Sequence, residues 1–99
     1  MTYQVKLTEK ARHDLRRLYA YMLDLDEDAA VRALEAITSA MAILERFPFS
    51  CRKAIGDNPL LRELLAPFGS SGYVVLFRID GSETVTIAAI RHQREEDYH

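Results

Sequence analysis

The side chains best suited to chemistry lie near the end of the sequence, where Arg91, His92 and Arg94 follow an apolar run. An imidazole can move protons near neutral pH, and a guanidinium can hold a phosphate or a carboxylate. Protein scaffolds often present such groups at the ends of strands. By residue type alone, however, the simpler interpretation is a polar strand end followed by a solvated tail.

Four more cations lie where a sheet could present them. Arg62 and Arg78 interrupt apolar runs, and Arg52 and Lys53 lie in a long loop. Together with Arg91 they could surround one concave surface of a sheet and bind an anion there. Each could equally extend to water from a strand edge, and this second interpretation is the better supported of the two.

Other kinds of site are not indicated. Cys51 is the only cysteine and has no histidine near it in the sequence, so we expect a structural thiol rather than a nucleophile. His13 has no second ligand four residues further on. The sequence also contains no phosphate-binding loop, dinucleotide fingerprint or zinc-ligand spacing. We therefore expect neither a metal nor another cofactor.

A β-hairpin is predicted to position the terminal cluster. Two runs rich in β-branched and aromatic residues, Tyr73–Ile79 and Thr84–Ile90, flank a turn that contains Asp80-Gly81. With an even-length loop, one face would carry Val74, Leu76, Val85, Ile87 and Ala89, and the other Tyr73, Val75, Phe77, Ile79, Ala88 and Ile90. The helices of the chain can cover only one of these apolar faces. The other face therefore indicates a partner protein.

The segment before the hairpin predicts a strand and two helices. A short strand over Tyr3–Leu7 leads to Thr8, which is placed to cap a helix over Glu9–Leu23. A second helix is predicted over Asp28–Phe47, capped by an aspartate at position 24 or 26. Its apolar stripe consists of Ala30, Leu34, Ile37, Met41 and Leu44. Because the connection is short, the two helices should form an antiparallel hairpin.

The remaining elements complete an α+β fold. Pro48–Pro59 is predicted to be a loop, and Leu61–Ala66 a strand. The order is then β-α-α-β-β-β, with a helical hairpin packed on a mainly antiparallel four-stranded sheet. The length of 99 residues fits a single domain over positions 1–99.

Composition limits the classes of function. The formal net charge is −2, so bulk charge predicts no direct nucleic-acid binding. A single cysteine excludes an internal disulfide and fits a reducing compartment. No apolar run approaches the roughly 20 residues of a membrane span, and the N-terminal residues lack a signal-peptide core. We expect a cytoplasmic protein that does not contact a membrane.

Several segments together resemble the ParE branch of the RelE/ParE toxin superfamily. They are VKLTEKARHDLRRLYAYM, the long second helix that ends at Phe47-Pro48, the following CRK loop, LRELLAPFGSSGYVVLFRID and TVTIAAIRHQRE. The resemblance covers nearly the whole chain. Its most specific part is the apolar strand that runs into Arg91-His92-Gln93-Arg94. The fold of that family has the same order of elements.

The resemblance implies the toxin of a type II toxin–antitoxin module, of the kind that stabilises plasmids. Such a toxin is neutralised by a ParD-like antitoxin and forms a hetero-oligomer with it. In ParE-type members the implied target is DNA gyrase, which the toxin inhibits by binding, without catalysis. The target-binding residues would then be Arg91, His92 and Arg94.

RelE-type members of the superfamily are enzymes that cut messenger RNA on the ribosome, and this is the alternative function. The catalytic residues implied by that alternative are Arg62, Arg78, Arg91, His92 and Tyr98. Two observations weigh against it. Lys53 is the only lysine near these positions, and the slightly acidic net charge is unfavourable for contacts with phosphates.

The antitoxins of this family wrap the toxin with a helix and an extended segment. The resemblance therefore implies that an antitoxin covers the groove of the helical hairpin and the open face of the sheet. The residues assigned to this surface are Leu15, Tyr19, Met22, Tyr73, Val75 and Phe77.

Overall fold

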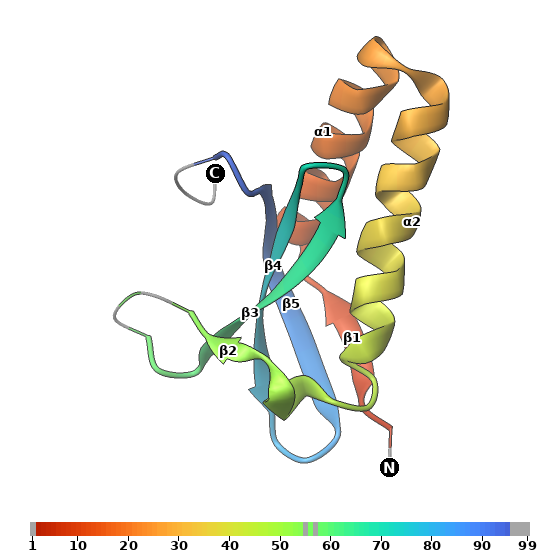
Figure 1. The fold of residues 1–99 in the computed structure, drawn as a ribbon. Helices are drawn as coiled ribbons and strands as arrows, with labels where there is room; N and C mark the ends of the chain where they lie inside the picture. Colours follow the sequence, from red (N-terminus) through yellow and green to blue (C-terminus); the bar gives the residue numbers. More distant parts are fainter. Residues whose placement is uncertain (1, 55, 57, 96–99) are drawn as a thin grey trace.

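A helical hairpin packs on one face of a twisted sheet (Figure 1). The computed structural model describes residues 2–54, 56 and 58–95. The elements are β1 (Gln4–Leu7), α1 (Glu9–Leu25), α2 (Glu27–Ile43), the 3-10 helix η1 (Pro48–Ser50), β2 (Arg52–Lys53), β3 (Leu61–Phe68), β4 (Ser71–Asp80) and β5 (Thr84–His92). Within the described ranges the sheet has five strands in the order β1-β5-β4-β3-β2. Strand β1 is parallel to β5, and the other neighbours are antiparallel.

The predicted α+β class and the order of elements are confirmed, with one strand more than expected. Strand β2 lies inside the predicted loop, and its two residues are too few to show an alternating pattern in the sequence. Strand β3 continues through Pro67, beyond the predicted end at Ala66. Because β2 pairs only with Arg62 and Glu63, Pro67 lies on an open edge of β3, where a proline is tolerated.

Side-chain caps fix where the helices begin. The Thr8 hydroxyl accepts a hydrogen bond from the backbone N–H of Ala11, as the sequence predicts. Asp26, rather than Asp24, caps α2. Helix α2 ends at Ile43, four residues before the predicted end at Phe47. Neither described helix is long and apolar enough to cross a membrane.

The core lies between the helical hairpin and the sheet. On α2 the buried positions are Ala30, Ala33, Ile37, Ala40 and, at the C-cap, Leu44. The prediction that Leu34 is a core residue was wrong, because its side chain is 36% exposed. Ala33 and Leu34 both fit the helical spacing, and the smaller residue occupies the position that faces the core.

Two positions on α2 should respond differently to truncation. Ile37→Ala is expected to lower the free energy of unfolding by about 2–5 kcal/mol, since it leaves a cavity in a packed core. Leu34→Ala should cost less than about 1 kcal/mol. Chemical denaturation followed by circular dichroism measures both. A larger loss for Leu34→Ala than for Ile37→Ala would contradict the observed helix orientation.

The length of the β4–β5 turn and a β-bulge together decide which residues of β4 and β5 face the helices. Asp80 pairs with Thr84, so the turn has three residues, and Val85 and Ile87 lie opposite Ile79 and Phe77. The one-residue bulge lies between Leu76 and Phe77 and shifts the register only of the pairs beyond it. Val85 and Ile87 therefore share the core face with Phe77 and Ile79, and both are fully buried. The even-length loop assumed from the sequence had placed them on the opposite face.

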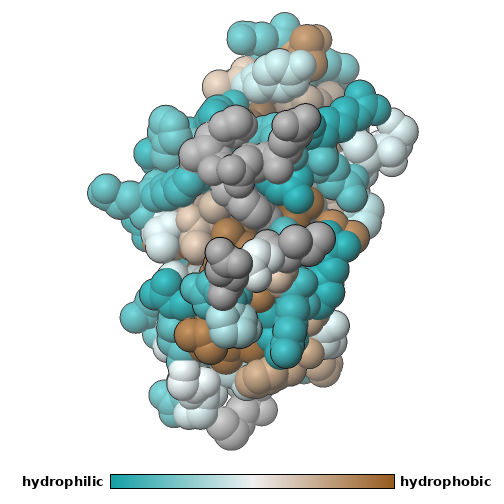
Figure 2. Space-filling model, turned by 90° about the vertical axis from the view of Figure 1, so that its left-hand side faces the viewer, coloured by the Kyte–Doolittle hydropathy of each residue, from teal (hydrophilic) through white to brown (hydrophobic). Residues whose placement is uncertain are grey.

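The outer face of the sheet, which is turned away from the helices, is consequently not a second apolar face. The paired positions place on it six polar residues, Glu63, Arg78, Asp80, Thr84, Thr86 and Arg91, interspersed with the apolar Leu61, Leu65, Val74, Leu76 and Ala89. On the side of the molecule that carries β2, Figure 2 shows polar and apolar residues interspersed. The predicted second apolar face was wrong, and the need for a partner to cover it no longer follows.

Candidate functional site

A pocket of about 490 Å³ lies where α1 meets the end of β5. We call it the β5-end pocket; it is lined by Arg17, Leu18, Tyr21, Met22, Tyr73, His92, Arg94 and Glu95. Leu18 and Tyr73 are buried and form an apolar floor, while charged side chains supply the rim. A concave apolar surface with a few polar groups is typical of a binding site.

His92 is held in place by three contacts. Its Nε2 lies 3.2 Å from the Ser71 hydroxyl, and its Nδ1 accepts a hydrogen bond from the backbone N–H of Arg94 at 3.1 Å. The ring meets Tyr73 edge to face, with the ring centroids 5.4 Å apart. Since both ring nitrogens have partners within the chain, this histidine is better suited to shaping a contact surface than to carrying protons.

Arg91 lies on the outer face of the sheet and does not line the pocket. Its Nη1 donates to the backbone carbonyls of His92 and Gln93 at 3.3 Å and of Glu95 at 2.8 Å. These bonds fix the turn that brings Arg94 and Glu95 to the pocket rim. The structure thus brings two of the three predicted target-binding residues, His92 and Arg94, to one pocket. The third, Arg91, lies on the outer face of the sheet.

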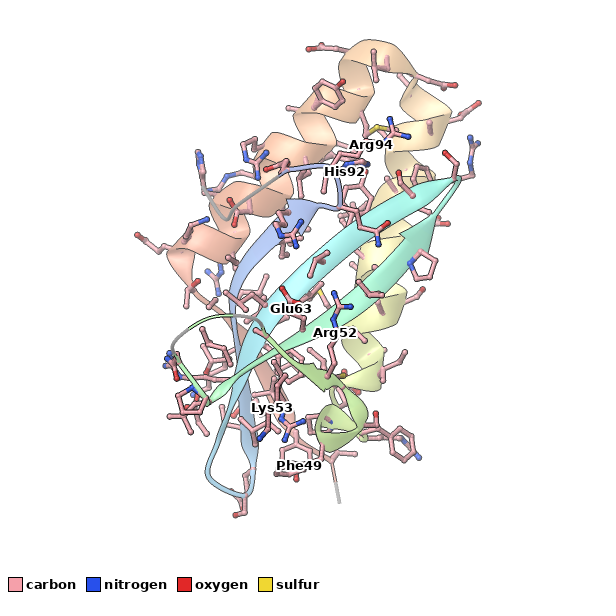
Figure 3. All side chains as sticks on the ribbon, turned by 60° about the vertical axis from the view of Figure 1, so that its left-hand side comes forward. Phe49, Arg52, Lys53, Glu63, His92 and Arg94 are labelled. Carbon is pink, nitrogen blue, oxygen red and sulfur yellow. The ribbon has the colours of Figure 1, made fainter. Side chains whose placement is uncertain are left out.

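Sequence reasoning missed Glu63. This carboxylate is only 7% exposed, although it lies on the outer face, and it approaches the guanidinium groups of Arg52 at 3.2 Å and Arg91 at 4.0 Å. We call these three residues the outer-face cluster; Figure 3 labels Glu63 and Arg52. The sequence did contain a signal for this residue, since Glu63 interrupts the apolar run of β3. The negative charge of Glu63 partly neutralises Arg52 and Arg91, two of the cations that were expected to bind an external anion.

Arg62 ties the loop after α2 to the sheet. Its Nη1 donates to the carbonyl of Cys51 at 2.7 Å and approaches that of Phe49 at 3.5 Å. Burial raises the pKa of the Cys51 thiol, against smaller opposing effects of Ser50 and Arg62. This fits the structural role that the sequence indicates for the cysteine. No group of three or more metal-binding side chains occurs within the described part of the chain.

Arg78 is paired with a neighbour on its own strand. Its Nε lies 2.8 Å from Asp80 Oδ1. The Thr86 hydroxyl and, secondarily, the Arg78 guanidinium lower the pKa of the Asp80 carboxyl. This ion pair is exposed and lies near the β4–β5 turn, at the opposite end of the hairpin from the β5-end pocket.

The residues expected for RNA cleavage are not assembled around one point. His92 lies opposite Tyr73, and Arg78 is five positions further along β4 than Tyr73, a distance of about 16 Å along the strand. Arg78 and Arg91 lie on the outer face, whereas His92 lies on the core face with Tyr73. Tyr98 lies outside the described residues.

The predicted antitoxin surface is divided by the fold. Val75 and Phe77 are fully buried beneath the helices, so their assignment to a partner surface was wrong. Tyr73 is almost fully buried as well, but it lines the β5-end pocket together with Met22. Three residues of α1 are partly exposed and remain predicted antitoxin contacts: Leu15, Tyr19 and Met22.

Comparison with protein families gives a match over nearly the whole chain. A family model described as the ParE toxin of the type II toxin–antitoxin system parDE matches residues 5–97. Toxin RelE1 of Caulobacter vibrioides is 33% identical over 96 residues, covering 97% of this chain and 99% of the relative. Toxin RelE3 of the same organism is 37% identical over 92 residues, covering 92% and 95%.

Solved structures share the fold. The chromosomal ParDE toxin–antitoxin system of P. aeruginosa contains a chain that superimposes with a TM-score of 0.74 at 22% identity, covering 92% of this chain and 96% of that chain. The RelBE2 toxin–antitoxin complex of Mycobacterium tuberculosis gives a TM-score of 0.68 at 24% identity, with coverages of 96% and 95%. At these identities the likeness establishes the architecture alone.

Proposed function

This chain belongs to the ParE toxin family of type II toxin–antitoxin systems, and we propose that it inhibits DNA gyrase by binding, without chemistry of its own. The partner that neutralises it is a cognate antitoxin. That partner is supported by the two similar folds, which come from toxin–antitoxin assemblies. The cytoplasm, where gyrase acts, is the expected location.

A binding mechanism is supported by one observation: the cations that could have taken part in catalysis already have other partners within the chain. Arg62 bonds to backbone carbonyls, Arg78 pairs with Asp80, and both lie away from His92. Cleavage of a phosphodiester needs the proton carrier and the cations within hydrogen-bonding reach of one phosphate. The β5-end pocket instead offers an apolar floor, and its rim carries the Arg17–Glu95 ion pair and the cation of Arg94. This suits an apolar side chain on a protein partner with a carboxylate that can face Arg94.

The names of the two relatives favour the alternative. Both are called RelE toxins, which supports ribosome-dependent cleavage of messenger RNA. On this chain the groups able to take part would be those of the outer-face cluster, with Glu63 accepting a proton and Arg52 and Arg91 stabilising the phosphate. Under this alternative Glu63→Gln should abolish cleavage.

Two assays run side by side decide between the targets. Purified toxin is added to a gyrase supercoiling reaction and to an in-vitro translation reaction whose messenger RNA is probed for cuts. We expect supercoiling to be blocked and the RNA to stay intact. Codon-positioned cuts in translated RNA, with gyrase unaffected, would overturn the proposal in favour of the ribonuclease.

Arg94→Ala should weaken gyrase inhibition about ten-fold, because it removes a rim cation that can face a partner's carboxylate. Inhibition by the variant should also fall less steeply as salt is raised. The concentration for half-inhibition measures both effects. Arg12→Ala removes an exposed arginine of α1 outside the pocket and serves as the matched control.

His92→Gln should have only a mild effect on gyrase inhibition, since glutamine keeps hydrogen bonding but does not titrate. The same half-inhibition assay measures it. Abolished activity with intact gyrase binding would instead give His92 a chemical role.

A further inference from the structure

Glu63 does not line the β5-end pocket, yet its contacts lead to the rim of that pocket. Its carboxylate lies on the outer face of the sheet, whereas Arg94 lies on the rim just beyond the end of β5; Figure 3 labels both residues. A carboxylate that is only 7% exposed is costly unless cations stabilise it. Arg52 and Arg91 supply those cations, so the three side chains hold one another in place.

The pairing of the strands brings Glu63 and Arg91 together. Glu63 lies opposite Leu76 of β4, and Leu76 lies opposite Ala89 of β5, so these side chains form one row across the outer face. Arg91 lies two residues beyond Ala89 and therefore on the same face. From there its Nη2 lies 4.0 Å from Glu63 Oε2. The Arg91 side chain is 17% exposed, so its guanidinium is largely shielded from water.

The two terminal nitrogens of Arg91 have different partners. Nη2 faces Glu63, and Nη1 donates to three backbone carbonyls of the turn over residues 92–95. Because a guanidinium is planar and rigid, the direction of one nitrogen fixes the direction of the other. The ammonium group of a lysine has a single nitrogen and could not face both sides. Arg91 therefore transmits the position of Glu63 to the turn.

The same turn carries Arg94. The backbone N–H of Arg94 donates to His92 Nδ1 at 3.1 Å, and the N–H of Glu95 donates to the carbonyl of His92 at 3.0 Å. Within the described residues, no hydrogen bond or ion pair holds the guanidinium of Arg94 itself. The place of that cation on the rim therefore depends on the backbone of the turn, which Arg91 holds.

We infer that Glu63 and Arg91 are positioning residues of the β5-end pocket, which set the place of Arg94 without touching the partner. The inference rests on the proposed binding of gyrase at this pocket. It changes the expected role of Arg91 from a residue that contacts the target to one that holds the contact residue in place. A preorganised rim binds more tightly, because the partner does not have to order it. The outer face of the sheet thereby influences a pocket on the other side.

The first test is a double-mutant cycle in the supercoiling assay. Arg91→Ala should raise the half-inhibiting concentration about ten-fold, as expected for Arg94→Ala, but the double variant should lose less than about two-fold more. Two arginines that each contact gyrase would instead give additive free energies and a combined loss of about one hundred-fold. That outcome would overturn the inference. Arg12→Ala is the matched control and should inhibit normally.

Two further variants separate position from charge. Arg91→Lys keeps the positive charge but has a single nitrogen, so it should inhibit nearly as poorly as Arg91→Ala. Glu63→Gln should weaken inhibition about three-fold by itself and have no further effect in the Arg91→Ala background. Full inhibition by Arg91→Lys, or an equal effect of Glu63→Gln in both backgrounds, would contradict the inference.

Amide signals of the free, ¹⁵N-labelled chain test the same link without gyrase. Arg91→Lys and Glu63→Gln should shift the Arg94 amide signal and speed its hydrogen exchange, while the signal of Ile87 in the core stays unchanged. Arg12→Ala should shift neither signal. An unchanged Arg94 signal would overturn the inference even where gyrase is inhibited. A shifted signal without any gyrase inhibition would leave the link standing and overturn the gyrase proposal instead.

Circular dichroism and the unfolding midpoint confirm that each variant is folded. If Arg91→Ala lowers the midpoint, the cycle is run with Arg91→Lys, which retains the charge beside Glu63.

Discussion

Asp14→Ala is expected to lower the free energy of unfolding by about 2–4 kcal/mol. Asp14 is fully buried, and its Oδ2 accepts the backbone N–H of Ile90 at 2.9 Å. Strand β1 ends opposite Ile87, so it does not reach far enough to pair with Ile90. The carboxylate takes the place of the missing strand, and alanine would leave a buried donor without an acceptor.

The ion pairs of Asp14 contribute less to this loss. Lys10 lies 2.9 Å from the carboxylate, but its side chain is 40% exposed and can turn to water. Asp14→Asn separates the two effects, since the amide oxygen can still accept from Ile90. Urea denaturation should show a clearly smaller loss for Asp14→Asn than for Asp14→Ala. Equal losses would mean that charge, rather than the bond to Ile90, carries the stabilisation.

Gly72→Ala should be the most damaging of the glycine substitutions, at about 3 kcal/mol. A Cβ at this position would lie 2.5 Å from the carbonyl oxygen of Ala66 and 3.0 Å from Pro67 Cα. Both obstacles are backbone atoms of β3, so the β3–β4 hairpin would have to shift. The carbonyl of Gly72 also accepts the Gln93 N–H at 2.9 Å, which links the hairpin to the rim of the β5-end pocket.

Gly69→Ala is the matched control in the same hairpin. Gly69 has φ +62°, and no atom beyond its chain neighbours lies within 4 Å of the place that a Cβ would occupy, so only the left-handed backbone conformation opposes alanine. The expected cost is about 1 kcal/mol. Thermal unfolding of both variants measures the difference. A larger loss at Gly69 than at Gly72 would contradict the close approach of the two strands.

The elements of the fold were predictable because each carries its own local signal. Thr8 marks the start of α1, Asp-Gly marks the β4–β5 turn, and helical spacing marks both helices. The pairing of the strands was not predictable, because neither the length of the turn nor a one-residue bulge can be read from the alternating pattern of β4 and β5. The three-residue turn, where an even-length loop was expected, places Val85 and Ile87 in the core, and the bulge keeps Ile90 on the same face as Val75.

The candidate site was only partly predictable for the same reason. His92 and Arg94 are neighbours in sequence and come to one pocket, so their association follows from local structure. Glu63 and Arg91 meet only through the pairing of β3, β4 and β5, which sequence spacing does not reveal. Burial of Val75 and Phe77 likewise depends on which face of the sheet the helices cover.

The position of β5 between β1 and β4 has a consequence for how the toxin is made. Strand β1 has β5 as its strand neighbour, and Thr8 bonds to Ala88, which is 80 residues away. The ribosome synthesises the helical hairpin first, and the local contacts of the hairpin can form at once. The sheet cannot be completed until residues 84–92 have been synthesised. A nascent chain interrupted before that point lacks the strand that joins β1 to β4. Such a fragment can keep the helical hairpin, but it lacks His92 and Arg94 and therefore one side of the β5-end pocket.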